Sequence, residues 1–218
     1  MKRKLNFLCV IVMLVLSYSV LEAVYFLSIG FKTGIELGMN SKISDVEKEE
    51  LMHLETLHLL PKDMSNSLLK DSILNEKSGQ YVPVSYDEII VSVNAQPSFL
   101  VKSISVLAQL GDLVTVIWAV ILFIRIIIAI NKSEIFNWRN VRCLRRLGVL
   151  LIIGFACSFL KSLLTVYNVG KVLSLANYSL SITDMVHTTS LVLGLSALIV
   201  AEVFAIGLRI KEEQELTI

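Results

Sequence analysis

The 218-residue chain has little of what stabilises most soluble or secreted domains. It contains three cysteines and three prolines, and charged residues make up 18% of it, against about 25% in soluble proteins. Its 20 lysines and arginines are balanced by 19 aspartates and glutamates, so the net charge is only +1. This composition excludes a disulfide-stabilised secreted module, a collagen-like repeat and a disordered tail. It also gives no basic surface, so we expect no direct binding to nucleic acid.

Neither the cysteines nor any known catalytic motif indicates an enzymatic activity. Cys9 and Cys157 fall in apolar runs and Cys143 in a basic stretch, with no CxxC or Cys/His metal spacing. The chain has no GxSxG, HExxH, P-loop or dinucleotide-binding sequence. We therefore expect no catalytic residues, no cofactor and no metal, and we interpret the protein as non-enzymatic.

Long apolar runs are what the chain has in abundance. Hydrophobic residues make up 55% of it, and its mean hydropathy is +0.71. About 20 apolar residues in a helix cross the hydrocarbon core of a bilayer, and four stretches reach or approach that length. The sequence therefore predicts an all-α membrane protein with four transmembrane helices. Its expected segments are 1–31 (cytoplasmic N-terminus and first helix), 32–104 (extracytoplasmic insertion), 105–130 (second helix), 131–146 (cytoplasmic Arg-rich loop), 147–167 (third helix), 168–187 (outer loop) and 188–218 (fourth helix and cytoplasmic tail).

Lysines and arginines set the predicted orientation, because short cytoplasmic loops are enriched in them. They occur at residues 2–4 and again in segment 131–146, where Glu134 is the one acidic residue. In segment 32–104 most of the charged residues are acidic, which suits the outer side. Both termini are therefore expected in the cytoplasm. The first apolar run is too long for a signal peptide and lacks a small-x-small cleavage site, so we expect it to remain as a helix.

The insertion between the first two helices predicts a small α+β structure. Ser44 and Glu47 fit a capping box at the start of a helix, which Pro61 would end. Between them, leucines recur at helical spacing at positions 51, 54, 57 and 60. The later sequences YVPVSY (81–86) and EIIVSV (88–93) are short β-branched runs typical of strands.

Two histidines fall within the predicted helix of the insertion. His53 and His58 are five residues apart, which places them about 140° apart around a helix. A metal site on a helix needs ligands on one face, as a spacing of four provides. We therefore interpret both histidines as ordinary solvated side chains.

Five charged residues are singled out inside the predicted spans, where charge is costly and often functional. Counting along the helices places Glu22, Asp112 and Lys161 toward the outer side, where they can form one cluster. Arg125 and Glu202 lie at similar depth near the inner side, where they can pair. Three roles stay open for these residues: ion pairs that fix helix packing, wetting at the interface, and a path for protons or ions.

Two blocks of sequence carry a resemblance to a known family. Residues 136–148 (FNWRNVRCLRRLG) fit a pattern of Phe, Asn-Val, Leu-Arg and Leu-Gly, and residues 202–218 fit a second block that begins Glu-Val-Phe. Together they resemble an uncharacterised bacterial membrane-protein family, domain of unknown function 2975. The resemblance implies a four-helix protein of the bacterial cytoplasmic (inner) membrane without assigned enzymatic activity. Family members are often encoded beside a small cytoplasmic helix-turn-helix regulator, which implies a regulatory pair.

Opposite charges on the expected cytoplasmic side suggest a partner-binding face. The arginine-rich segment is basic and the tail acidic, so the two can dock on each other and form one surface. The residues assigned to this surface are Phe136, Asn140, Arg142, Arg145, Glu213 and Glu215. The alternative is that each segment merely anchors its own helix.

The leading interpretation is a sensing or partner-binding protein of the inner membrane. In it the outer insertion receives a signal, and the cytoplasmic face presents it to a regulator. The alternative is a small transporter or an immunity-type membrane protein that works through Glu22, Asp112 and Lys161. Broken helices or internal repeats, which favour transport, are absent from the sequence. A homodimer stays open, and the lipid bilayer is the one partner that composition requires.

Overall fold

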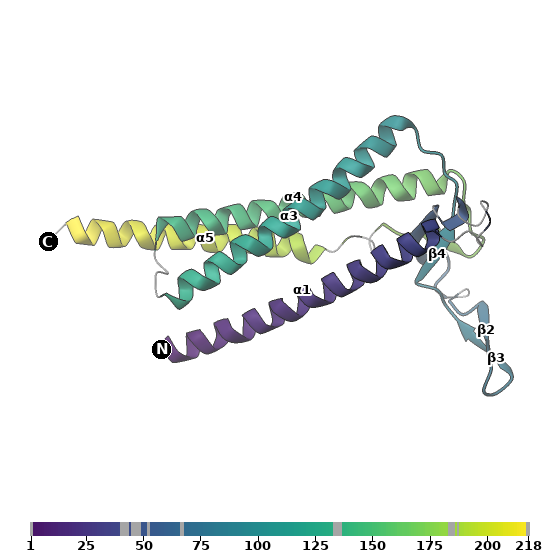
Figure 1. Cartoon of the computed structure of the whole chain (residues 1–218), viewed down its shortest axis with the longest axis horizontal. Coiled ribbons are helices and arrows are strands. Elements are labelled where there is room, and N and C mark those ends of the chain that lie inside the picture. The colour runs from purple at the N-terminus through teal and green to yellow at the C-terminus, as the bar shows by residue number, and fades with distance from the viewer. Residues whose placement is uncertain are drawn as a thin grey trace. The chain divides into compact units, whose positions relative to one another are not determined.

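Four long helices dominate the computed structural model, which describes residues 2–39, 44, 49–51, 53–65, 68–132, 137–182, 186 and 188–216 (Figure 1). The helices are α1 (Lys2–Met39), α3 (Phe99–Asn131), α4 (Trp138–Gly170) and α5 (Thr188–Leu216). Each is long and apolar enough to cross a membrane. A helix satisfies all of its backbone hydrogen bonds within one segment, which lipid requires. The prediction of four such helices is confirmed.

Within the described residues, five short strands form two small sheets. They are β1 (Leu54–Pro61), β2 (Asp71–Asn75), β3 (Gln80–Val84), β4 (Glu88–Ser92) and β5 (Tyr178–Leu180). β1 pairs antiparallel with both β4 and β5, which gives the order β4-β1-β5. β2 and β3 form a separate hairpin, whose turn contains Gly79 at φ +66°. The strands predicted within 81–86 and 88–93 are confirmed as β3 and β4.

The helix predicted over residues 44–60 is wrong from Leu54 onward, where the chain forms strand β1. Leu57 and Leu59 are buried, whereas Leu54 and Leu60 are exposed. This alternation has the period of two that a pleated strand imposes. The leucine spacing of three is compatible with a helix, but two neighbouring strands supply the hydrogen bonds that decide the structure.

The two histidines of this segment therefore do not share a helix. His53 lies in a turn before β1 and His58 lies within β1, and both are half-buried rather than fully solvated. The Nδ1 atom of His58 is buried and has no hydrogen-bond partner among the described residues. Of the predicted capping box, Ser44 is described and is not helical, and Glu47 lies outside the described residues.

The chain divides into two compact units. The helical unit comprises residues 1–40, 109–157 and 188–218, and the sheet unit comprises residues 41–108 and 158–187. Helices α3 and α4 contribute to both, because α3 enters the helical unit at Gln109 and α4 leaves it after Cys157. The described side chains of α1 are exposed, apart from Cys9, Met13 and Leu16.

The sheet unit closes around a small apolar core of Leu57, Val93 and Val169. The segment predicted as an outer loop, 168–187, is part of this fold rather than a free connection. It supplies β5, and Lys62 Nζ donates to its Leu175 carbonyl oxygen at 2.7 Å. Residues 175–180 of this segment are therefore held by backbone pairing and side-chain hydrogen bonds to the insertion.

Helices α4 and α5 approach closely within the helical unit. A Cβ added to Gly148 would lie 2.8 Å from the Gly194 carbonyl oxygen, and one added to Gly194 would lie 2.9 Å from the Gly148 carbonyl oxygen. Small residues allow such contact between helix backbones in a membrane. Val141, Ala205 and Leu208 continue the packing toward the end of α4 that contains Trp138. We call this contact between α4 and α5 the α4–α5 seam.

Candidate functional site

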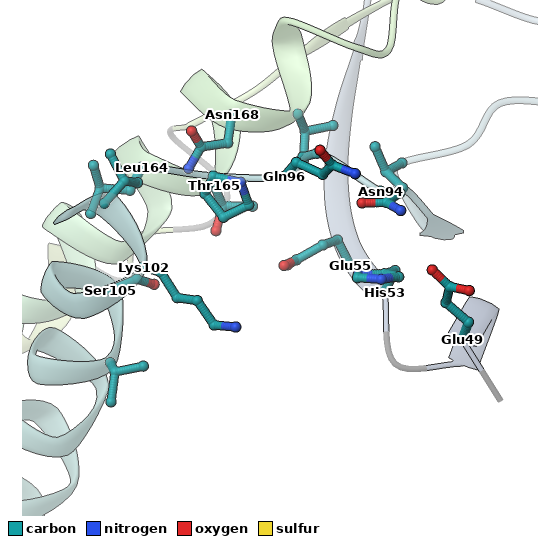
Figure 2. A pocket seen from close by; sticks show the side chains of 16 residues that line it. Glu49, His53, Glu55, Asn94, Gln96, Lys102, Ser105, Leu164, Thr165 and Asn168 are labelled. Carbon is teal, nitrogen blue, oxygen red and sulfur yellow. The ribbon is translucent and has the colours of Figure 1, made fainter. Parts of the chain in front are cut away.

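A pocket of about 730 Å³ lies within the sheet unit (Figure 2). This volume falls in the range of about 300–1,000 Å³ that is usual for small-molecule sites. The chain segments around it are the turn before β1, the 93–97 segment after β4, the start of α3 and the end of α4. Its polar side chains are Glu49, His53, Glu55, Asn94, Gln96, Lys102, Ser105, Thr165 and Asn168.

Opposite charges stand on opposite sides of the pocket. Figure 2 shows Lys102 extending from α3 toward Glu55 and His53, with Glu49 on the far side of His53. Among the described residues, no ion pair within 4.0 Å joins Lys102 to either carboxylate. The ammonium group and the carboxylates therefore both remain available to a ligand that enters the space between them.

Backbone hydrogen bonds hold one wall of the pocket in place. The Val93 N–H donates to the His53 carbonyl oxygen at 2.9 Å, which extends the β1–β4 pairing by one step. The Ser92 hydroxyl donates to the Glu50 carbonyl oxygen at 2.7 Å and so ties the residues before β1 to the end of β4. Val93, directly after β4, and Val169 of α4 are buried and add apolar side chains to the pocket lining.

Gln96 lines the pocket with a strained backbone. Its φ is +31°, and it is the one non-glycine residue with positive φ in the described part of the chain. It also precedes Pro97, and a residue before proline favours an extended backbone. Strain of this kind costs about 1–3 kcal/mol and clusters at functional sites. The strained backbone of Gln96 is therefore a second observation that favours this pocket as a functional site.

The chemistry of the pocket suits a small polar molecule that carries both charges. Glu49 and Glu55 can receive an ammonium group, and Lys102 can receive a carboxylate. Asn94 and Asn168 offer amide donors and acceptors that can fix orientation. No group of three or more His, Cys, Asp or Glu residues able to hold a metal was found in the described ranges.

The sequence did not predict this pocket. The sequence analysis assigned His53 to a solvated helix face and so gave no reason to connect it with Lys102 or Asn168. In the structure these two residues reach the same pocket from α3 and α4. The available signal was a cluster of amides next to predicted helix ends, namely Asn94 and Gln96 before α3 and Asn168 near the end of α4.

A second group of polar contacts lies along the α4–α5 seam. The Arg145 Nε atom donates to Glu202 Oε1 at 2.8 Å, and Arg145 Nη2 donates to Glu202 Oε2 at 3.0 Å. Two parallel bonds of this kind fix both distance and orientation. Toward the end of α5, Trp138 Nε1 donates to Glu212 Oε1 at 2.6 Å. The two contacts follow from the antiparallel course of α4 and α5, which brings the start of one beside the end of the other.

The residues predicted for partner binding lie mostly on helices rather than in a loop. α4 begins at Trp138, so the arginines assigned to segment 131–146 stand in its first turns. Arg142 is exposed, Arg145 and Asn140 are half-buried, and Phe136 lies outside the described residues. At the same end of the seam, Glu213 and Glu215 are exposed on the last turn of α5. Arg145 of the basic segment pairs with Glu202 of α5, and Trp138 beside it bonds to Glu212 of the tail.

The predicted pair of Arg125 and Glu202 is corrected by the structure, in which Glu202 pairs with Arg145. Counting residues along a helix gives the depth of a side chain but not the side of the helix on which it lies. The sequence also placed Arg145 in segment 131–146, outside the predicted spans, so it predicted no pair between Arg145 and Glu202. Arg125 is exposed on α3. Asp112 is half-buried near the α3–α4 crossing, where a Cβ added to Gly154 would lie 3.6 Å from Asp112 Oδ1.

The predicted outer cluster of charges is not assembled within one unit. Glu22 is exposed on α1 in the helical unit, whereas Lys161 is exposed on α4 in the sheet unit. The cluster that would join them with Asp112 therefore stays a prediction.

Comparison with known proteins identifies one family. Residues 70–218, more than half of the chain, match a family described as a protein of unknown function (DUF2975). The match includes both sequence blocks on which the resemblance rests, and it also includes Lys102, α4 and α5. No curated protein and no solved structure matches the chain significantly.

Proposed function

The chain belongs to the DUF2975 family, whose function is unknown, and we propose that it is a non-enzymatic sensory protein of the bacterial inner membrane. In this proposal a small polar ligand binds in the pocket of the sheet unit outside the cytoplasm. Both termini lie in the cytoplasm, as the distribution of lysine and arginine indicates. The cytoplasmic end of the α4–α5 seam binds a partner, for which the family resemblance suggests a small helix-turn-helix regulator.

The pocket is the observation that carries this proposal. It combines Lys102 on one side with Glu49 and Glu55 on the other (Figure 2), and its lining also includes the buried Val93 and Val169. Such a distribution suits a zwitterion of amino-acid size, because each charged group of the ligand meets an opposite charge. A sensor needs a site of this kind on the side from which its signal comes.

Helices α3 and α4 provide the connection between ligand and partner in this proposal. Lys102 stands near the start of α3, and Thr165 and Asn168 near the end of α4, so a ligand would contact both helices. The first turns of the same α4 carry Trp138 and Arg145 of the seam. A ligand that binds one arrangement of the two helices better than another shifts the population toward it.

The partner surface is expected around the exposed arginines at the start of α4. Arg139 and Arg142 are exposed there, and Glu215 lies on the last turn of α5. Arg145 serves the seam itself, since its guanidinium is bonded to Glu202. Arg142 is therefore a better test of partner binding than Arg145, whose replacement would also disturb the packing of the helices.

The ligand is tested on the full chain in lipid nanodiscs by the shift of its unfolding temperature with each common L-amino acid. We expect at least one amino acid to stabilise the wild type, and the Lys102→Gln variant to lose that shift. Lys70→Gln, the same substitution in the sheet unit outside the pocket, should keep it. Absence of a shift with every amino acid, or an equal shift in the Lys102→Gln variant, would contradict a zwitterion site.

The partner is tested by mild crosslinking and affinity purification from the native membrane. We expect a cytoplasmic protein with the wild type, and its loss with Arg142→Glu. Lys77→Glu provides the matched control, because it reverses a lysine in the exposed β2–β3 turn. Equal recovery with Arg142→Glu and Lys77→Glu would place the partner elsewhere and reject the proposed surface.

A further inference from the structure

A groove of about 370 Å³ lies between α3 and α4 in the helical unit, and it shares no lining residue with the pocket already described. It is lined by Trp118 of α3 and by Arg145, Arg146, Val149 and Leu150 of α4. Its lining thus combines two guanidinium groups with three apolar side chains. The exposed side chains of Trp118, Arg146 and Val149 make it accessible from the surface of the helices.

The charged and apolar parts of the groove are separated along the helix axis. Val149 and Leu150 follow Arg146 by three and four residues, which corresponds to about 5–6 Å of rise. They belong to the uncharged run of α4 from Leu147 to Leu160, whereas both arginines precede that run. The α3–α4 packing places Leu150 in the same cluster as Ala119, so Trp118 stands at the apolar level. The arginines therefore lie at the membrane boundary, and the apolar lining extends toward the bilayer centre.

The two guanidinium groups retain the capacity to bind an anion. Arg145 uses Nε and Nη2 for Glu202, which leaves part of its five-donor array unused. Arg146 is exposed, and no ion pair with it is found in the described part of the chain. One carboxylate thus faces two arginines, and a phosphate would balance the remaining charge.

We propose that this groove binds an anionic phospholipid. Its phosphate lies against Arg146 and the free edge of Arg145, and the first part of one acyl chain lies against Trp118, Val149 and Leu150. A phospholipid fits because the same molecule carries a phosphate and a chain in the order in which the groove presents arginines and apolar side chains. The bilayer supplies such molecules directly to the surface of helices that cross it, and basic sites at this level bind anionic headgroups.

The test uses fluorescence quenching of Trp118 by phospholipids with brominated acyl chains. Trp118 and Trp138 are the two tryptophans of the chain, so a Trp138→Phe background isolates the signal. The full chain is placed in bilayers of fixed bromine content that contain brominated phosphatidylglycerol or, in parallel, brominated phosphatidylcholine. We expect stronger quenching by phosphatidylglycerol than by phosphatidylcholine. Arg146→Gln should reduce the preference for phosphatidylglycerol about fivefold, which is the effect of one arginine near an anionic headgroup.

The matched control is Arg142→Gln, which removes an exposed arginine of the same helix that does not line the groove. It should keep the preference for phosphatidylglycerol. Equal quenching by the two lipids in the wild-type groove, or an equal loss with Arg142→Gln, would overturn the proposal. Inorganic phosphate added to the phosphatidylcholine sample should leave the quenching unchanged, and a change would assign the arginines to a free anion instead.

A second measurement covers the case in which Trp138→Phe fails to fold, because that residue bonds to Glu212. Native mass spectrometry of the otherwise wild-type chain counts phosphatidylglycerol molecules that stay bound, and compares Arg146→Gln with Arg142→Gln. Retained lipid that is lost only with Arg146→Gln would support the groove. Equal retention by both variants would reject it.

Discussion

The sheet unit buries leucine and valine side chains from its strands and from the end of α4, whereas in the helical unit two glycines allow the backbones of α4 and α5 to approach each other. In the first, Leu57, Val93 and Val169 form the core that water drives together. In the second, the Gly148–Gly194 contact and the Arg145–Glu202 pair hold two apolar helices. Lipid is as apolar as a leucine side chain, so the hydrophobic effect does not hold the helices together there. Close packing and polar contacts do so instead. The chain thus uses apolar burial in the unit that faces water, and close packing with an ion pair between the helices that suit a membrane.

The largest difference between the units is expected when Leu57 is replaced by alanine. Leu57 is fully buried, and the loss of a leucine from a core costs about 2–5 kcal/mol. Hydrogen exchange of the β1 and β4 amides should accelerate strongly, while the helical circular dichroism of the full chain is retained. Leu54→Ala removes an exposed leucine of the same strand and should have a small effect. Equal acceleration in both variants would show that the sheet unit has no specific core.

A smaller effect, in the other unit, is expected for Gly194→Val. The added side chain meets the Gly148 carbonyl oxygen, and a backbone atom cannot rotate away as a side chain can. Overpacking of this kind costs about 1–3 kcal/mol, which should lower the unfolding temperature of the helices in detergent. Gly34→Val on α1 is the control, since a Cβ there meets nothing within 4 Å. If Gly34→Val destabilised the helices as much, the seam would not be the contact that holds them.

The smallest effect is expected for the ion pair of the seam. Arg145→Gln and Glu202→Gln, alone and together, form a double-mutant cycle that isolates the coupling of the two side chains. We expect a coupling of about 1 kcal/mol, since polar contacts between membrane helices fall in the range of roughly 0.6–2 kcal/mol. Unfolding in detergent followed by circular dichroism measures it. Additive effects of the two substitutions would mean that the two side chains have no coupling energy and that the pair does not stabilise the contact between the helices.

The helices were predictable from the sequence because hydropathy is a local property. A run such as Leu147–Leu160 has no charged residue, and no distant part of the chain is needed to interpret it. Strands β3 and β4 were likewise visible in their β-branched residues. The helix that was expected around Leu54 and Leu60 failed because β1 depends on partners that begin at Glu88 and at Tyr178. No local pattern carries that information.

The sites were less predictable than the elements, for a related reason. The pocket brings Lys102 of α3 beside His53 and Asn168, from two other segments of the chain. Glu202 was recognised as an intramembrane charge, but its partner was assigned by depth alone. Arg145 was assigned to the cytoplasmic segment 131–146, and its pairing with Glu202 depends on the early start of α4 and on how α4 and α5 pack.

The position of β5 also sets the order in which the protein can be completed. Leu60, at the end of β1, accepts a hydrogen bond from Ser179 of β5, which lies 119 residues further along the chain. At a synthesis rate of about 5–20 residues per second, β1 is made roughly ten seconds before the strand that covers its second edge. During that interval α3 and α4 are synthesised, and the edge of β1 stays unpaired with β5. The three-stranded sheet therefore closes only after β5 has been made, by which time the third long helix, α4, has already been synthesised.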